Sequence, residues 1–264
     1  ITPIFEFIFF KVSKFLFSRS FRKNHFSGKL CIMNSYTKKI ISNYNKVLKE
    51  IRYFEKFYNR EQNSVNLMVV SKTFAEERIT PIILEGQKDF GENKVQEGFE
   101  KWMEIKKVYP DIRVHLIGSL QSNKVNQALK IFDCIHTIDR KKIARKINDS
   151  IENNFFGNFE KFRFFIQVNT GSEPQKSGVK LSEVDDFLKW CTNETKLKIV
   201  GLMCIPPINE SPKKHFIIIK ELVNKYGLQQ LSMGMSNDYE TAIECGSTFL
   251  RLGSAILGKR DKFT

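Results

Sequence analysis

The chain has 264 residues, which suits one large barrel or two ordinary domains and is long enough to bury a substantial core. Apolar residues make up 41% of the sequence, as in ordinary globular proteins, and the net charge is +14. The basic residues are scattered, without a basic helix carrying interleaved aromatic residues or an arginine-rich stripe. The charge is therefore attributed to compositional bias, and no nucleic-acid partner is expected.

Cysteines and histidines form no recognisable ligand motif. The five cysteines are odd in number and include no CxxC pair, which argues against a disulfide framework or a zinc site and fits a reducing compartment such as the cytoplasm. The four histidines show no HExxH or other ligand spacing. No metal site is therefore expected.

Residues 1–32 differ from the rest of the chain and are treated as an N-terminal extension, so that the main domain is expected over residues 33–264. The extension is rich in Phe and Ile, but charged residues interrupt it, and no apolar run approaches the roughly 20 residues of a membrane span. Three interpretations stay open: upstream sequence from an over-long gene model, an organelle transit peptide, or a peripheral membrane anchor. The first is favoured, because Met33 directly precedes the first helical pattern, and no membrane partner is expected.

Apolar residues recur at helical spacing from Ser35 to about Tyr58, and this pattern predicts a helix ahead of the main fold. After it, short apolar runs alternate with amphipathic stretches, as in βαβ units with a parallel sheet. Eight such runs, with no GxGxxG after the first, favour a closed (β/α)8 TIM barrel over a Rossmann sheet. The runs are 66–71, 89–92, 114–118, 134–139, 162–169, 198–206, 230–234 and 248–253. Helices are predicted at 75–87, 94–107, 123–132, 141–153, 181–192, 212–226 and 238–245.

Polar residues and glycines fall at the ends of these runs, where a barrel carries its functional site. Lys72 directly follows the apolar run LMVVS. A lysine desolvated at the mouth end of a buried strand has a lowered pKa and a nucleophilic amine suited to Schiff-base chemistry, although a surface lysine gives the same pattern. The last two runs end in SMGMS (232–236) and RLGS (251–254). The glycines and serines of these stretches fit either a phosphate-binding cup or two ordinary glycine turns.

Longer stretches resemble the pyridoxal phosphate homeostasis protein family, whose barrel is related to the N-terminal domain of alanine racemase. They follow the family's order over nearly all of residues 37–260, whereas residues 1–32 lie outside the resemblance. The stretches are VVSKT (69–73), FGENKVQE (90–97), HLIGSLQSNK (115–124), HTID (136–139), QVNTGSEPQKSGV (167–179), GLMCIPP (201–207) and LSMGMSNDYETAIECGSTFLRLGSAILGKR (231–260).

The resemblance implies a fold-type III barrel that binds pyridoxal 5'-phosphate (PLP), with Lys72 as the Schiff-base lysine. Its phosphate would be bound by Ser236, Gly253 and Ser254, and Arg251 would face the pyridine nitrogen. The other residues implied at the mouth are Asn93, Met203, the loop Ser119–Lys124 and Lys176. One departure is Lys94, where the family usually has an aromatic residue, and it puts the local stacking, not the binding, in question.

Arg251 bears on the implied function, because a guanidinium stays protonated and only donates hydrogen bonds. Facing the pyridine nitrogen, it would keep that nitrogen unprotonated and make the ring a poor electron sink. The implied function is therefore a carrier without robust turnover that holds PLP and supplies it to PLP-dependent apo-enzymes.

The alternative is an amino-acid racemase-like PLP enzyme on the same barrel. A racemase of the related family needs a second domain that supplies another base, and the chain ends shortly after the eighth run, so that domain is not expected. Of the two candidates for a second base, Cys204 is predicted to be a core residue and Tyr239 to open a helix. Without the second domain, a monomer is expected. An RNA-binding protein, suggested by charge alone, lacks the common RNA-binding signatures.

Overall fold

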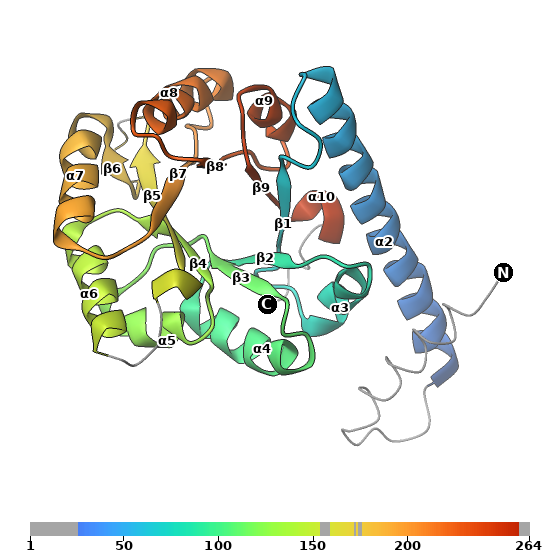
Figure 1. Ribbon diagram of the computed structural model, residues 1–264. Coiled ribbons are helices and arrows are strands. Elements are labelled where there is room, and N and C mark those ends of the chain that lie inside the picture. Colours follow the sequence, from blue (N-terminus) through green and yellow to red (C-terminus); the bar gives the residue numbers. More distant parts are fainter. Residues whose placement is uncertain (1–25, 154–158, 172, 174–175, 259–264) are drawn as a thin grey trace.

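The computed structural model describes residues 26–153, 159–171, 173 and 176–258, whose strands form one closed parallel barrel (Figure 1). Within these segments the main strands pair in the order β1-β2-β3-β4-β5-β7-β8-β9, and β9 pairs back onto β1. A two-residue strand, β6, adds only to β5. The strands are β1 (Asn66–Val70), β2 (Asp89–Glu92), β3 (Arg113–Leu116), β4 (Cys134–Ile138), β5 (Arg163–Asn169), β6 (Val179–Lys180), β7 (Ile199–Cys204), β8 (Gln230–Ser232) and β9 (Phe249–Leu252).

Helices alternate with the strands and cover the outside of the barrel (Figure 1). The helices are α2 (Phe26–Phe57), α3 (Glu76–Leu84), α4 (Val95–Val108), α5 (Val125–Leu129), α6 (Lys141–Glu152), α7 (Val184–Glu194), α8 (Pro212–Lys225), α9 (Tyr239–Glu244) and α10 (Ser254–Leu257). Short 3-10 turns are η1 (Ser122–Lys124), η2 (Phe159–Lys161) and η3 (Leu181–Glu183). Each main strand leads into a helix, as in a (β/α)8 TIM barrel.

The predicted fold class is confirmed, and each of the eight predicted strands lies where its apolar run was found. Three short elements lie outside the predicted ranges: β6, which pairs through Val168 and Asn169, the 3-10 turn η2 and the single turn α10. All three are too short for a periodic pattern to mark them. The predicted helix at 123–132 is divided into the turn η1 and the short helix α5.

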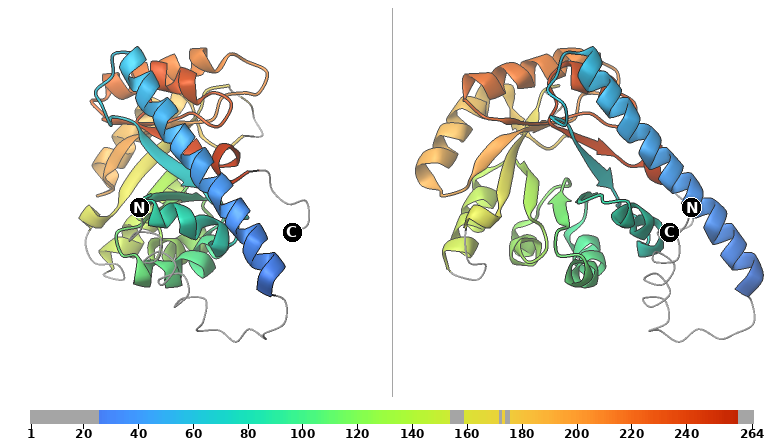
Figure 2. Two further views of the ribbon diagram at one scale, coloured as in Figure 1. Left: turned by 90° about the vertical axis from the view of Figure 1, so that its right-hand side faces the viewer. Right: turned by 45° about the vertical axis from the view of Figure 1, so that its right-hand side comes forward.

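Helix α2 is confirmed as the element ahead of the barrel, and it runs along the outside against α3, α9 and α10 (Figure 2). Its inner face buries Ile40, Tyr44, Val47 and Ile51, which recur at the three- and four-residue spacing of a helix side. The Tyr44 hydroxyl donates to the side-chain oxygen of Gln87 at 3.1 Å. This helix therefore packs on the barrel as part of the same core.

The start of α2 at Phe26 places the predicted domain boundary at residue 33 inside a helix. Residues 1–25, which include most of the predicted extension, lie outside the described residues. Among the described helices, α2 included, none has the length and apolar character that a membrane crossing needs.

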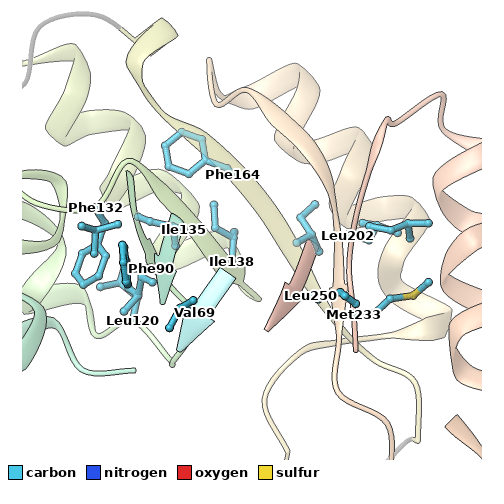
Figure 3. Close-up of a cluster of buried hydrophobic side chains, with 14 of the residues drawn as sticks. Val69, Phe90, Leu120, Phe132, Ile135, Ile138, Phe164, Leu202, Met233 and Leu250 are labelled. Atoms are coloured by element: carbon cyan, nitrogen blue, oxygen red, sulfur yellow. The ribbon is translucent and has the colours of Figure 1, made fainter. Parts of the chain in front are cut away.

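The apolar core lies mainly between the barrel wall and the surrounding helices. Successive residues of a strand face opposite sides, so Val69, Ile135 and Leu202 point outward into this core while their neighbours point into the barrel (Figure 3). The interior contains a smaller apolar cluster of Cys134, Phe165 and Met203, against which Phe249 packs. Buried polar side chains also lie in the interior, and they include Asp89, His115, His136, Ser232 and Arg251.

Candidate functional site

The predicted site residues gather at one end of the barrel. Lys72 follows β1, Asn93 follows β2, Ser236 follows β8, and the pair Gly253–Ser254 follows β9. Parallel strands point their carboxyl ends the same way, so these residues share the mouth of the barrel. Strands β1, β9 and β8 are direct neighbours, which brings Lys72 to the same sector of the mouth as both serines.

The two serines meet in space, because the hydroxyl of Ser254 donates to the Ser236 oxygen at 3.3 Å. Gly253 is the N-cap of α10, and a Cβ at this position would lie 3.1 Å from the carbonyl oxygen of Val70. Glycine therefore allows the turn after β9 to lie close against β1. Half-buried Ser236 and exposed Ser254 present two hydroxyl donors beside this turn, and such donors can bind a phosphate oxygen.

The loop after β8 is held by its own residues. Asp238 accepts a hydrogen bond from the backbone N–H of Met235 at 2.5 Å, and the Asp238 N–H donates back to the Met235 carbonyl at 3.1 Å. Gly234 adopts a φ of +97°, which L side chains rarely adopt. The bend turns the chain from β8 toward α9 and fixes Ser236 at the mouth.

Lys72 is half-buried and lies between two anchored neighbours. Ser71 is fully buried; its hydroxyl donates to Glu92 at 2.8 Å, and its N–H donates to the Gly91 carbonyl at 3.0 Å. Thr73 has a φ of +66° and donates its N–H to the carboxylate of Glu97. A β-branched residue with positive φ is uncommon and persists only where the surroundings fix it.

A buried ion pair supports this loop from behind. The Lys101 ammonium donates to the Ser71 carbonyl at 2.8 Å and to the Glu92 carboxylate at 2.9 Å. Burial raises the pKa of Glu92, and Lys101, Ser71 and Trp102 oppose that rise. The same lysine also reaches Glu97, so one ammonium links the residues on both sides of Lys72. Neither Glu92 nor Lys101 was a predicted site residue.

Arg251 lies inside the barrel and is only 4% exposed. Its guanidinium donates to the Ser232 hydroxyl at 2.9 Å through Nη1 and to the Cys204 carbonyl at 2.9 Å through Nη2. Burial lowers the pKa of Arg251 from its ordinary value, yet an arginine side chain remains a cationic donor. Met203 also points inward, next to Cys134 and Phe165.

Below Arg251, two histidines that the sequence did not assign to the site lie in contact. His115 Nδ1 is 3.0 Å from His136 Nε2, and both rings are buried. His115, Cys134 and His136 bring three potential metal-ligating atoms within 4.8 Å of one another, although no metal site was expected. The outer ring nitrogens lie 2.9 Å from Asp89 and 2.9 Å from Ser232, respectively, so every histidine nitrogen of this group has a hydrogen-bond partner.

The remaining predicted residues lie around the mouth with other partners. Lys176 forms an ion pair with Glu173 at 2.6 Å, and Lys94 is an exposed N-cap of α4. In the Ser119–Lys124 loop, the Ser119 hydroxyl is 3.0 Å from that of Ser177. This contact joins the loop after β3 to the segment that follows β5.

Asn93 is half-buried, and its backbone packs directly against Gly118. A Cβ on Gly118 would lie 2.1 Å from the Asn93 carbonyl oxygen, a distance that no side chain permits. Glycine is therefore required where the loops after β2 and β3 meet, and the contact fixes Asn93 at the rim.

Comparison with known proteins agrees with this arrangement of barrel and mouth. Residues 48–261 match the family described as alanine racemase, N-terminal domain. The pyridoxal phosphate homeostasis protein of Vibrio alginolyticus is 40% identical over 232 residues, which cover 84% of this chain and 98% of that protein. Its counterpart in Escherichia coli K12 is 35% identical over 211 residues, covering 76% of this chain and 88% of that protein.

A solved structure extends the comparison. PipY of Synechococcus elongatus, described with PLP bound, superposes with a TM-score of 0.67 at 30% identity, covering 79% of this chain and 100% of that one. Fold and site thus define a barrel of the alanine racemase N-terminal domain class. Within that class, the chain belongs to the pyridoxal phosphate homeostasis protein family. These two relatives are named for pyridoxal phosphate homeostasis.

Proposed function

We propose that this protein binds pyridoxal 5'-phosphate as a Schiff base on Lys72 and supplies it to PLP-dependent apo-enzymes. The observation that carries the proposal is that a half-buried lysine follows β1 in the same sector of the mouth where the hydroxyl pair Ser236–Ser254 follows β8 and β9. One end of this sector offers an amine and the other offers phosphate donors. A phosphorylated aldehyde is the ligand that needs both.

Each residue has a defined task in this proposal. Lys72 would hold the cofactor through its amine, a group that is suited to Schiff-base chemistry with an aldehyde. The hydroxyls of Ser236 and Ser254 and the backbone at Gly253 would hold the phosphate, and Arg251 would donate to the pyridine nitrogen. When bound, the cofactor supplies an electron-withdrawing ring, and a purely donating arginine keeps that ring a weak electron sink.

The same geometry supports a carrier over the racemase-like alternative. Racemisation needs a second base opposite Lys72. Burial raises the pKa of Cys204 to about 12. Burial and the neighbouring Glu50 raise the pKa of Tyr239 to about 12, and its hydroxyl donates to Glu50 at 2.8 Å. Neither group is prepared to accept a proton near neutral pH.

The setting of this function is also part of the proposal. Recipients are transient apo-enzyme partners, with no nucleic acid or membrane involved, and the carrier acts as a monomer. A cytoplasmic location is supported by four cysteines that are free and buried, as is usual in a reducing compartment. They are Cys134, Cys191, Cys204 and Cys245. An organelle stays the alternative if residues 1–32 act as a transit peptide.

The test is covalent trapping. Purified protein incubated with PLP should absorb as a Schiff base, and borohydride reduction followed by peptide mapping should tag Lys72. The variant Lys72→Ala should lose the absorbance, while Lys124→Ala and Lys176→Ala, which remove other lysines near the mouth, should keep it. A tag on Lys124 or Lys176 alone would overturn the assignment.

A further inference from the structure

A continuous chain of hydrogen bonds crosses the barrel interior from its base to Arg251. At the base, the guanidinium of Arg113 donates to both carboxylate oxygens of Asp89, the first residue of β2, at 2.7 and 2.5 Å. From Asp89 the chain continues through His115, His136 and Ser232, with contacts of 2.9, 3.0 and 2.9 Å. It ends where Arg251 donates to Ser232 at 2.9 Å. Five different strands thus contribute one connected line of side chains.

The direction of each bond follows from the groups at the two ends. Asp89 is ionised and only accepts, so the Nε2–H of His115 donates to it. With a neutral His115, the Nδ1 atom accepts from the Nε2–H of His136. The Nδ1 atom of His136 then accepts the proton of the Ser232 hydroxyl, whose lone pairs receive the N–H of Arg251. Every donor and acceptor along the line is satisfied in this arrangement.

An extra proton on the histidine pair would reverse this order. His115 Nδ1–H would donate to His136, and His136 Nδ1–H would donate to Ser232, which already accepts from Arg251. The Ser232 hydroxyl proton would then have no acceptor among the contacts of the described residues, although Ser232 is fully buried. A buried donor without a partner is costly, so the neutral order is favoured.

The surroundings of the His136 ring also disfavour a charge on that ring. Burial lowers the pKa of His136 well below its ordinary value, and His115 and Arg251 lower it further. Phe165 stacks on the His136 ring at 4.1 Å between centroids, and Phe249 lies 5.6 Å from the His115 ring. The titratable and charged groups that face the pair or its neighbour Cys134 are Asp89, Arg113, Asp133, Cys134, Arg163 and Arg251.

We propose that Ser232 and His136 are positioning residues for the cofactor site, which hold the Arg251 guanidinium through a hydrogen-bond chain of fixed polarity anchored on Asp89. Two of the five N–H donors of Arg251 are committed to Ser232 and the Cys204 carbonyl. The chain thereby fixes the plane of the guanidinium and leaves its other donors for the pyridine nitrogen. The part that concerns the cofactor rests on the proposed function, whereas the polarity is a property of the protein alone.

The polarity is tested without any cofactor by nitrogen NMR of protein labelled with 15N-histidine, with signals assigned through single His→Gln variants. At neutral pH both His115 and His136 should carry their proton on Nε2. In Ser232→Ala, the Nδ1 atom of His136 loses its donor, and its nitrogen shifts should move while His215 stays unchanged. A proton on Nδ1 of His136, or a charged pair at neutral pH, would overturn the proposal.

The positioning role is tested by the rate of PLP release. Removing the Ser232 hydroxyl takes one partner from a charged donor, so Ser232→Ala should release PLP roughly 10-fold faster. Ser232→Thr keeps a hydroxyl and should stay near the unmodified rate. The matched control is Ser247→Ala. Ser247 is also fully buried and donates to the Met233 carbonyl at 2.7 Å, but it does not belong to the hydrogen-bond chain that ends at Arg251.

These outcomes separate the inference from the proposed function. Unchanged release in Ser232→Ala, or equal acceleration in Ser247→Ala, would overturn the positioning role. If the unmodified protein bound no PLP, the proposed function would fail, while the NMR result would still decide the polarity.

Discussion

The hydroxyls of Ser236 and Ser254 lie 3.3 Å apart although the serines follow different strands. Their meeting follows from topology, because β8 and β9 are neighbours whose carboxyl ends reach the mouth together. β1 flanks β9 on the other side and places Lys72 in the same sector of the mouth. The proposed phosphate donors and the proposed amine thus follow three adjacent strands.

We predict that Ser236→Ala and Ser254→Ala each weaken PLP affinity roughly 10-fold, because each removes a hydrogen bond to a charged phosphate. Affinity would be measured by equilibrium titration of the cofactor's absorbance. The control is Ser177→Ala, which removes an exposed hydroxyl from another serine pair, with Ser119. Full affinity in both alanine variants would place the phosphate elsewhere.

Much of this arrangement was predictable from the sequence. The position of Lys72, Ser236 and Ser254 at the mouth is predictable, because strand ends are marked by the change from an apolar run to polar residues and glycine, whereas the role of each residue came from the family resemblance. Strand alternation also marks His115 and His136 as residues of strands, but not the groups that they contact. Those partners come from strands distant in the sequence, and only barrel closure sets them opposite one another.

The Glu92–Lys101 ion pair is a second feature that the sequence pattern does not predict. Glu92 is the last residue of β2 and Lys101 lies on α4, and at the sequence level each resembles an ordinary surface charge. Their burial to 0% and 10% exposure depends on how α4 packs on the barrel. A pattern of apolar residues contains no information about such a pairing.

We predict that Lys101→Met destabilises the fold by about 3–5 kcal/mol near neutral pH, because it leaves a buried carboxylate unpaired. Burial already raises the pKa of Glu92, so protonation relieves the unpaired charge and the loss should shrink as the pH falls. Denaturant unfolding at several pH values measures this. The control Lys107→Met removes a 63% exposed lysine of the same helix and should change stability little. Equal effects of the two variants would contradict the role of the pair.

Asp89, at the base of the hydrogen-bond chain inside the barrel, should make the stability of the fold depend on pH in the acidic range. Burial would raise the pKa of Asp89, but hydrogen bonds from His115 and Arg113 outweigh it and lower the pKa from 3.8 to about 2. The carboxylate therefore contributes stability above pH 3.8, which is lost as the pH falls toward 2. We predict that Asp89→Asn costs about 2 kcal/mol at neutral pH and that this difference narrows in strong acid. A constant difference across that range, in urea unfolding curves, would contradict the linkage.

Removing residues 1–32 should leave the barrel folded and able to bind PLP. Among the α2 residues whose burial is described, the buried apolar ones, Ile40, Tyr44, Val47 and Ile51, all follow the cut, so this part of the packed face is retained. Thermal unfolding and PLP titration of the shortened protein are the measurements. A large drop in melting temperature would show that the removed segment packs on the barrel.

The final prediction is that the PLP-loaded protein does not racemise amino acids at a useful rate. Racemisation requires a proton to leave one face of the α-carbon and return on the other, so two groups must act from opposite sides. Lys72 serves one side. Cys204 and Tyr239, the candidates in the matched motifs, both have pKa values raised to about 12. Each therefore keeps its proton near neutral pH.

Proton–deuterium exchange at the α-carbon of alanine and serine, in heavy water, separates the two functions. A lone Lys72 can remove and return a proton on one face, which gives slow exchange with retention of configuration. Arg251 slows even this step, because a donor to the pyridine nitrogen withdraws less charge from the α-carbon than a protonated nitrogen would. Rapid exchange with inversion would require an unrecognised second base and would favour the racemase-like alternative. Tyr239→Phe would then show whether that base is the tyrosine on α9, since it removes the hydroxyl and keeps the ring against Phe54.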